Sequence, residues 1–584
     1  MTANVRIFFW ALLGVAALLN VEMWYRDYPN RPAAVVSAPS APLDDSVPSA
    51  APAAAAPATA AATGGAPAAT TAPAVVAAPV AAPAASGAPA ATSTEASAAT
   101  AGSVHVVTDV LDIDVSLAGG ELKRADLPKY PVVKNETTPV RLLNRDPSDA
   151  NADPLYVVQT GLAPAAGGVA PTHQTLFTSA VSEVKLADGQ DEVRLPLTWT
   201  NGAGVTVTKT LVFRRGQYRI GLDYSINNAS TEPFVFASYA QILRDNTPIQ
   251  SSMFKAGSSA YKGPAIYDGT KYEKLKITGS SPATLDQSVT NGWLAALQHH
   301  FVAAIVPPAG TAYHYALKTQ GNQYLLSATG PQQSVAPGTT ATLSEVLFVG
   351  PKLQAQLKQA GPRLELVTDY GKLTFLAQPL FWVLDKVHAL FGNWGFTIIV
   401  TTFLLKLLFY PLSEASGKSM AKMKAVQPRI KTLQETYKDD RQKLGQEMMQ
   451  LYQREKINPL AGCLPLLIQM PVFLAFYWVL MESVEMRQAP FMGWIHDLSS
   501  RDPYFILPAI MAAAMFVQYK LNPQMGTDPV QQKVFMIMPL AMSVTFAFFP
   551  SGLVLYWVTN TLLSILQQWN INRRIAAATA RARR

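Results

Sequence analysis

Apolar and polar residues alternate with a period of two between about residues 104 and 366. The clearest run covers residues 218–226, where every second residue is apolar, and turn sequences such as Asn201-Gly202 separate runs of this kind. This alternation is typical of antiparallel strands that bury one face. We therefore expect residues 104–366 to form one large all-β domain, built as a sandwich of sheets.

The spacing of apolar residues changes to three and four after residue 370. Leu373, Leu376, Leu380 and Leu384 follow this spacing, with polar residues between them, which predicts an amphipathic helix within residues 367–392. Because a long apolar run comes next, such a helix would lie flat in a membrane interface. The alternative is a helix that packs on the β domain.

Long apolar runs dominate the last third of the chain. The candidate membrane spans are residues 395–411, 464–481, 504–519, 534–549 and 553–567. Several of them are shorter than the roughly 20 residues of a usual span, which indicates a thinned bilayer or tilted helices.

One more apolar run, residues 7–21, lies near the N-terminus. It ends in Glu22-Met23-Trp24-Tyr25 and not in a small-residue cleavage site, so we expect an uncleaved signal anchor within residues 1–31 in place of a cleaved signal peptide. The fold class predicted is a multi-domain membrane protein, with a six-helix α-helical transmembrane bundle and a large all-β domain.

The segments between these units differ sharply in composition. Residues 32–103 consist almost entirely of Ala, Pro, Thr, Ser, Val and Gly, which predicts a disordered linker with nothing large enough to form a core. The remaining units predicted are a second span within 393–412, a cytoplasmic helical hairpin at 413–462, four further spans within 463–569 and a basic tail at 570–584.

Basic residues are distributed unevenly between the apolar runs. The 413–462 segment carries ten Lys and Arg residues and the tail carries five Arg residues, whereas the 482–503 segment has no basic excess. Cytoplasmic loops of membrane proteins are enriched in Lys and Arg. We therefore expect cytoplasmic N- and C-termini and a β domain on the outer side of the membrane.

The overall composition agrees with a membrane protein. Charged residues make up 15% of the 584 residues, against about 25% in soluble chains. The net charge of +8 is compatible with nucleic acid, but in an apolar chain it more often reflects positive loops at a membrane.

Motifs for catalysis or cofactor binding are missing from the sequence. The single cysteine, Cys463, excludes an intramolecular disulfide and a cysteine-based metal centre. Gly417-Lys418-Ser419 resembles the end of a phosphate-binding loop, but Leu412 stands where that motif needs glycine. No His-Glu-x-x-His sequence occurs. We expect no enzyme activity, no metal and no cofactor.

The predicted hairpin carries four methionines, Met420, Met423, Met448 and Met449. Methionine side chains adapt to apolar partners of varied shape, so they could form a soft receiving surface. The alternative is that they hold the two helices of the hairpin together.

Lys406 is the one charged residue well inside a candidate span, and Thr402 lies one turn away on the same face. A lysine at the centre of a membrane helix costs roughly 2.5–3.5 kcal/mol, so such residues usually face a wet cavity and have a function. The alternative is that the amine extends past Pro411 to the cytoplasmic headgroups.

Other polar residues lie in the candidate spans. They are Thr559, Asn560, Thr561 and Ser564 beside Tyr556 and Trp557, with Gln469 and Gln518 in two other spans. Such groups can simply bond helices to each other. Together with Lys406 and a basic cytoplasmic side, they indicate a water-accessible groove.

Several short segments of the last third form a recognisable set. They read GNWGF (392–396), YPL (410–412), SMAKM (419–423), QP (427–428), NPL (458–460), GCLPLLIQMP (462–471), RQAPF (487–491) and FPSGLVLYW (549–557). Together they resemble the YidC/Oxa/Alb family of membrane protein insertases. The resemblance covers roughly residues 369–570. The early anchor and the outer β domain are similar to the Gram-negative form, whose periplasmic domain is a β-supersandwich.

The resemblance implies a protein of the bacterial inner membrane that inserts and helps to fold other membrane proteins. It would act alone or with the Sec translocon, through a hydrophilic groove open to cytoplasm and lipid. Lys406 matches the central cation of the groove, which is usually Arg, and Trp557 matches its aromatic residue. Met470, Pro471 and Phe473 match the stretch that contacts substrate.

The partners implied are nascent membrane proteins, the Sec translocon, the ribosome through the basic loops and tail, and anionic lipids, but not DNA. Two other classes of function stay open from the residues alone. One is a multi-pass transporter. The other is a periplasmic sensor whose β domain binds a ligand, with Trp293, His299, His300 and His314 as sugar-site candidates or as packing residues.

Overall fold

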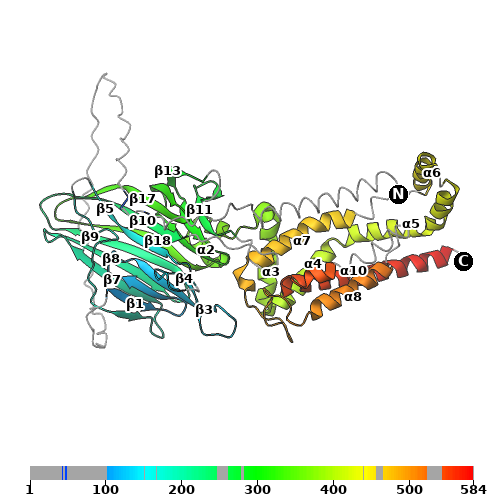
Figure 1. The fold of residues 1–584 in the computed structure, drawn as a ribbon, viewed down its shortest axis with the longest axis horizontal. Coiled ribbons are helices and arrows are strands. Elements are labelled where there is room, and N and C mark those ends of the chain that lie inside the picture. The colour runs from blue at the N-terminus through cyan, green and yellow to red at the C-terminus, as the bar shows by residue number, and fades with distance from the viewer. Residues whose placement is uncertain are drawn as a thin grey trace, which may run out of the picture.

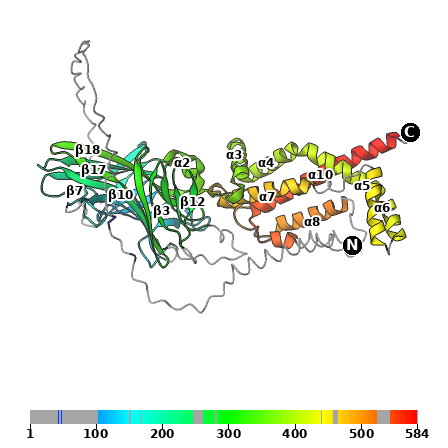
Figure 2. The ribbon, with the colours of Figure 1, turned by 90° about the horizontal axis from the view of Figure 1, so that it is seen from above.

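The computed structural model describes residues 43, 47–48, 102–149, 152–165, 168–245, 261–277, 282–437, 440–455, 464–521 and 542–582. These residues form an elongated molecule with a β domain at one end and a set of helices at the other (Figures 1 and 2). The predicted N-terminal anchor and the first half of the predicted span 534–549 lie outside the described residues.

The β domain contains two large sheets. One has ten strands in the order β13-β16-β17-β10-β5-β3-β2-β1-β6, with β4 paired to β3, and the other has eight in the order β12-β11-β14-β15-β18-β9-β8-β7. The strands are β1 Ser103–Val107, β2 Asp112–Ser116, β3 Leu122–Pro131, β4 Pro139–Leu143, β5 Tyr156–Pro164, β6 Glu183–Lys185, β7 Glu192–Thr200, β8 Val205–Arg214, β9 Arg219–Asn228, β10 Phe234–Asp245, β11 Gly263–Tyr267, β12 Tyr272–Lys274, β13 Leu285–Thr290, β14 Trp293–Leu297, β15 Phe301–Val306, β16 Ala312–Gln320, β17 Gln323–Val335 and β18 Thr339–Pro351.

The period-two pattern of the sequence corresponds to real strands. On β9, Ile220, Leu222, Tyr224 and Ile226 are all buried in the core, while the residues between them are less buried or exposed. Residues of both sheets belong to this one core, as expected for sheets packed face to face. The prediction of a large β sandwich is therefore confirmed.

A short helical stretch connects the sandwich to the helices. It consists of α2 (Gln354–Ala360) and the 3-10 turns η1 (Leu364–Val367) and η2 (Gly371–Leu373). Buried Tyr370 lies at its end and accepts a hydrogen bond from Gln354 Nε2 at 2.6 Å. A salt bridge of 2.7 Å from Lys274 to Asp369 fixes the same stretch to β12.

The amphipathic helix is present as α3 (Thr374–Phe391), and Gly392 ends it with a φ of 65°. Its buried side, which includes Leu380 and Leu384, packs against α7 and α4. A second apolar set remains exposed. It comprises Phe375, Trp382, Leu390 and Phe391.

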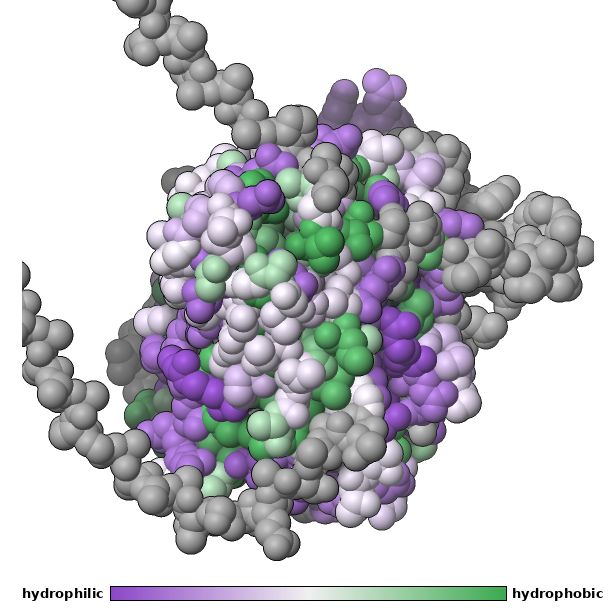
Figure 3. Space-filling model, turned by 90° about the vertical axis from the view of Figure 1, so that its left-hand side faces the viewer, coloured by the Kyte–Doolittle hydropathy of each residue, from purple (hydrophilic) through white to green (hydrophobic). Residues whose placement is uncertain are grey.

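Most of the other helices run lengthwise away from the β domain, and the helix at Arg441–Arg454 lies across their far end (Figures 1 and 2). They are α4 Trp394–Leu408, α5 Tyr410–Thr436, α6 Arg441–Arg454, α7 Leu464–Glu482, α8 Ile506–Leu521 and α10 Ser551–Ala582, with the 3-10 turn η4 at Val484–Met486. Of the exposed large apolar side chains in the described residues, four lie in the β domain and all others in the helical part. Figure 3 shows the end of the β domain, where apolar groups are scattered among polar ones.

The predicted span 395–411 is not one straight helix. α4 ends at Leu408, and α5 starts at Tyr410 with a bend of 61°. Pro411 explains the break, because proline lacks the amide hydrogen needed inside a helix and is tolerated in its first turn. Among the described residues, no single helix has both the length and the apolar composition of a membrane span, and only this bent pair meets that criterion when taken together.

Leu43 differs from the sequence-based expectation for residues 32–103. It is buried against Val157, Leu243 and Leu325, and its amide donates to Gln323 Oε1 at 3.1 Å. The outer face of the larger sheet is apolar at this point, which accounts for the burial of Leu43. Most of the predicted linker lies outside the described residues, so its disorder stays a prediction.

Candidate functional site

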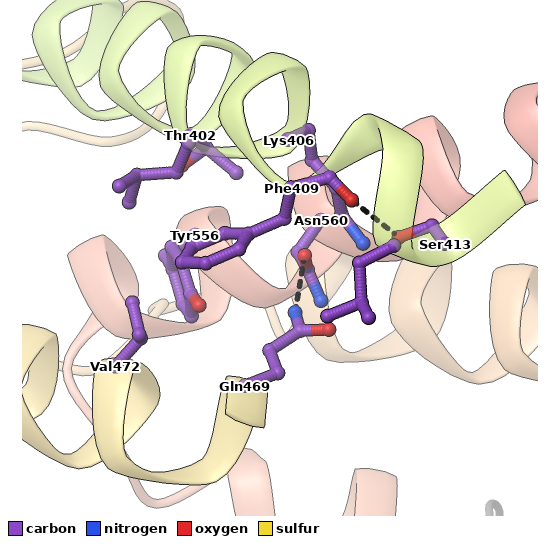
Figure 4. A pocket seen from close by; sticks show the side chains of 10 residues that line it. Thr402, Lys406, Phe409, Ser413, Gln469, Val472, Tyr556 and Asn560 are labelled. Atoms are coloured by element: carbon purple, nitrogen blue, oxygen red, sulfur yellow. Dashed lines mark hydrogen bonds between the residues drawn. The ribbon is translucent and has the colours of Figure 1, made fainter. Parts of the chain in front are cut away.

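A small cavity lies where α4, α5, α7 and α10 meet (Figure 4). Its volume is about 30 Å³, which is room for about two water molecules. The residues that line it are Thr402, Leu405, Lys406, Phe409, Leu412, Ser413, Gln469, Val472, Tyr556 and Asn560.

The spacing on α4 brings its residues to one side of the cavity. Thr402 and Lys406 are four residues apart, so their side chains lie one above the other on a helix. Thr402 Oγ1 donates back to Ile398 O at 2.6 Å, which satisfies the hydroxyl inside the helix. After the bend, Ser413 on α5 returns to the same cavity and donates to Phe409 O at 3.1 Å.

Lys406 is half-buried in the last turn of α4. Its Nζ donates to Ser564 Oγ on α10 at 2.8 Å, and Ser564 Oγ in turn donates to Asn560 O at 2.7 Å. Within the described residues, no carboxylate forms a salt bridge with this amine. The positive charge is therefore held by a neutral hydroxyl next to a water-sized space.

The other side of the cavity is also polar. Gln469 Nε2 on α7 donates to Asn560 Oδ1 on α10 at 2.6 Å (Figure 4). Tyr556 stacks on Phe476, with their ring centroids 4.5 Å apart. An amine, two amides and several hydroxyls thus converge among apolar helices. This arrangement can solvate a polar or acidic group.

The structure brings together five of the residues predicted for a groove: Thr402, Lys406, Gln469, Tyr556 and Asn560. The other three lie outside this lining. Thr561 is buried, Gln518 is half-buried on α8, and Trp557 contacts Phe473 and Phe546 at centroid distances of 4.9 and 5.3 Å.

The three residues predicted to contact substrate lie together on α7. Met470 and Pro471 are exposed, whereas the Phe473 ring is turned toward Tyr556 and Trp557 of α10. Met470 and Pro471 are therefore accessible to an external apolar segment.

The methionines of the hairpin are divided between two environments. Met423 and Met448 pack against Val426 and Ile430 and hold α5 and α6 together. Met449 is 57% exposed, and the side chain of Met420 lies outside the described residues. Met423 and Met448 thus have the surroundings that the packing alternative describes.

Sequence reasoning missed five residues of the cavity lining: Leu405, Phe409, Leu412, Ser413 and Val472. Helical spacing from Lys406 and Gln469 could have identified Phe409 and Val472. Leu412 and Ser413 could not be found in this way, because the bend of the chain brings them back.

The sugar-site candidates of the β domain do not form one site. Trp293 is buried and donates from Nε1 to Pro362 O at 3.0 Å, whereas His314 forms a surface ion pair with Asp286 at 2.9 Å. His299 and His300 stack on each other where the β domain meets the helices. Among the described residues, no group of three or more metal-binding side chains is found.

Two family models match the chain. Residues 103–383 match the YidC periplasmic domain, and residues 386–578 match the 60Kd inner membrane protein. The membrane protein insertase YidC of Thioalkalivibrio sulfidiphilus is 49% identical over 486 residues, covering 81% of this chain and 85% of that protein.

The corresponding protein of Methylococcus capsulatus is 46% identical over 482 residues, covering 82% of this chain and 87% of that protein. Among solved structures, an active YidC insertase with its first transmembrane domain resolved covers 80% of this chain and 92% of its own, with 19% identity and a TM-score of 0.36.

Proposed function

Because the chain belongs to the YidC family of membrane protein insertases, we propose that the cavity around Lys406 is part of the path by which it moves polar segments into the membrane. The chain is an inner membrane protein that acts on nascent membrane proteins, and it is not an enzyme. The proposal concerns the residues that carry this activity.

The proposal rests on the bonding partners of the Lys406 amine. Its amine is bonded to Ser564 Oγ and has no carboxylate partner in the described part of the chain. An unpaired cation at the edge of an apolar helix attracts acidic residues of a translocated tail. Because a hydroxyl is a weaker partner than a carboxylate, an incoming acidic group can replace it.

The driving force comes from the substrate. A segment of about 20 apolar residues gains roughly 6–12 kcal/mol on entering lipid. Each charge that must cross costs roughly 2.5–3.5 kcal/mol. A polar passage lined by Lys406, Gln469 and Asn560 lowers this cost by shortening the dry part of the path.

The neighbouring helices support a locally thin membrane beside this passage. α3 exposes Phe375, Trp382 and Leu390 on the side turned away from α4 and α7, as expected for a helix lying in the interface. The 61° bend after Leu408 shortens the apolar length of α4. Both features reduce the thickness that a substrate must cross.

The remaining parts of the proposal concern topology and partners. The basic hairpin and tail lie in the cytoplasm, where positive loops are favoured, and the β domain lies in the periplasm. The hairpin exposes Met449 and many charged residues and receives nascent chains from the ribosome. The protein works alone or beside the Sec translocon, and its basic tail contacts the ribosome or anionic lipid.

The test is replacement of Lys406 in a strain depleted of its own insertase. Lys406→Ala should abolish insertion of a small single-span protein with an acidic translocated tail, and Lys406→Arg should retain it. Lys520→Ala is the matched control, because Lys520 also lies in the last turn of an apolar helix, α8, but is exposed. Normal insertion by Lys406→Ala at equal protein level would refute the role of the charge.

A further inference from the structure

A second cavity, separate from the one around Lys406, lies where the β domain meets the helices. Its volume is about 440 Å³, which is within the range of small-molecule sites, about 300–1,000 Å³. The wall includes His299 and His300 from the β domain, Met481 from α7, Arg487 and Arg501 from the loop after α7, and Phe548. It therefore combines cationic and apolar groups.

The positive charges in this wall outnumber the negative ones. Asp497 is the one acidic residue of the lining, and its oxygens already accept from Ser499 N at 2.8 Å, Ser499 Oγ at 2.6 Å, Ser500 Oγ at 2.7 Å and Gln488 N at 3.1 Å. Neither Arg487 nor Arg501 forms a salt bridge within the described residues. The two arginines leave an excess of positive charge.

One donor in the wall lacks a partner. Arg487 Nη1 is buried without a hydrogen-bond partner in the described structure. Burial holds the pKa of His300 well below its usual value and lowers that of His299 to about 4, so both rings are neutral, and His299 already donates its one N–H to Met481 O at 2.8 Å. A buried donor without a partner indicates a missing ligand or water.

The wall is held in place by bonds that cross the junction. Arg487 Nη2 donates to Pro131 O at 2.7 Å, and Gln488 Nε2 donates to the same oxygen at 3.0 Å. Lys134 Nζ donates to Gln488 O at 2.7 Å and His299 bonds to Met481 O at 2.8 Å. A ligand would therefore meet Arg487 in a position that is already fixed, which lowers the cost of binding.

We propose that this cavity binds the phosphate group of an anionic phospholipid, with Arg487 and Arg501 as its charged ligands. Arginine pairs with phosphate through two parallel hydrogen bonds. The apolar residues Leu480, Met481 and Phe548 of the same wall would contact the glycerol and the first methylenes of the acyl chains.

The position of the cavity supports a lipid as the source of the phosphate. It lies at the boundary between the polar β domain and the helices that carry most of the exposed apolar side chains. If these helices span the membrane as proposed above, this boundary is the level of the outer headgroups. The inference rests on that placement but not on the role of Lys406.

The experiment uses the full-length protein in detergent and measures lipid binding by native mass spectrometry. Phosphatidylglycerol, phosphatidylcholine and inorganic phosphate are added in separate titrations to wild type, Arg487→Gln, Arg501→Gln and Arg194→Gln. Arg194 is the matched control, since it is an exposed arginine on β7 that pairs with Glu192.

Wild type should bind one phosphatidylglycerol more tightly than phosphatidylcholine. Each cavity substitution should weaken that binding about tenfold, because it removes one charge-assisted contact, while Arg194→Gln should bind as wild type does. Equal binding by wild type and both cavity variants would overturn the proposal. So would equal affinity for the two lipids, or occupation by inorganic phosphate without phosphatidylglycerol.

Arg487→Gln removes bonds between the β domain and the helices and could change their packing. Arg501→Gln tests the same lipid binding without removing such bonds. The Arg501 side chain is exposed and forms no hydrogen bond or ion pair within the described residues. Insertion activity is not the readout, so loss of lipid binding and failure of the Lys406 proposal are separate results.

Discussion

Gly395 on α4 lies directly against the ring of Phe491. A Cβ atom at residue 395 would be 2.0 Å from Phe491 Cδ2. The ring cannot easily move, because Asn393 Nδ2 donates to Phe491 O at 2.9 Å while the Asn393 side chain also caps α4. The start of α4 is thus fixed to the loop after α7.

Gly395→Ala should therefore lower the free energy of unfolding by about 1–3 kcal/mol, the usual cost of overpacking. Gly445→Ala is the matched control. Nothing lies within 4 Å of a Cβ at that helical position, so alanine should stabilise α6 by up to about 1 kcal/mol. Thermal unfolding of the purified variants measures both, and a Gly395→Ala protein as stable as wild type would contradict the close contact.

Ser564→Ala removes the hydroxyl that accepts from Lys406 Nζ. Hydrogen bonds to charged groups typically contribute about 1.5–3 kcal/mol, and here the adjacent cavity can supply water as a replacement. We expect a loss near the lower end of this range and a reduced but measurable rate of insertion.

Ser413→Ala is the control for Ser564→Ala, because the Ser413 hydroxyl lines the same cavity and bonds only to a backbone carbonyl, Phe409 O. Unfolding and insertion assays should separate the two variants. Equal losses of stability and insertion in the two variants would show that the Lys406–Ser564 bond contributes no more than the Ser413–Phe409 bond.

The junction between the β domain and the helices should weaken in acid. Burial lowers the pKa of His299 to about 4 from its ordinary value near 6.5. As the pH falls from about 6.5 to 4, the unfolded chain binds a proton that the folded protein does not. The folded state therefore loses stability over this window, with an upper bound of about 3 kcal/mol.

His299→Gln removes this titration while leaving an amide that can donate to Met481 O. Melting temperatures of the variant and of wild type are compared at pH 7.5, 5.5 and 4.5. The melting temperature of the variant should rise relative to that of wild type as the pH falls. A difference in melting temperature that does not depend on pH would exclude His299 as the cause of the loss of stability in acid.

Leu43→Asp should release the docked part of the Ala/Pro-rich tract. It would place a charge in an apolar pocket formed by Val157, Leu243 and Leu325. Full burial of a leucine contributes about 1.5–3 kcal/mol, so the β domain should lose roughly 2 kcal/mol of stability. Hydrogen exchange should also speed up on β10 and β17, whereas Leu43→Met should leave both measurements near those of wild type.

The β domain could be predicted from the sequence because its pattern is local. On β9, each apolar residue points to the core and each intervening residue points away, so period two is enough to identify the strand. The order of the strands could not be predicted, since it depends on pairs far apart in sequence such as β1 with β6.

Each polar residue around Lys406 can be identified from the sequence, because it interrupts an apolar run. The sequence does not show that these residues lie close together in the fold. Gln469 and Asn560 are 91 residues apart, and only the packing of α7 on α10 brings them together. The bend after Leu408 could not be predicted either, because a proline such as Pro411 at the end of an apolar run indicates the end of a span as readily as a bend. Leu43 was missed because one leucine in a long tract of small residues produces no periodic signal.

The burial of Leu43 limits how far the N-terminal segment can extend from the β domain. A trans chain spans at most about 3.6 Å per residue. If the whole tract from residue 31 to residue 102 were free, it could reach about 250 Å. With Leu43 fixed on the sheet, only the dozen residues before it determine the reach, which falls to about 40 Å. The chain between residues 43 and 103 starts and ends on the same domain, so the number of residues between these two points does not affect the distance between that domain and the residues before 31.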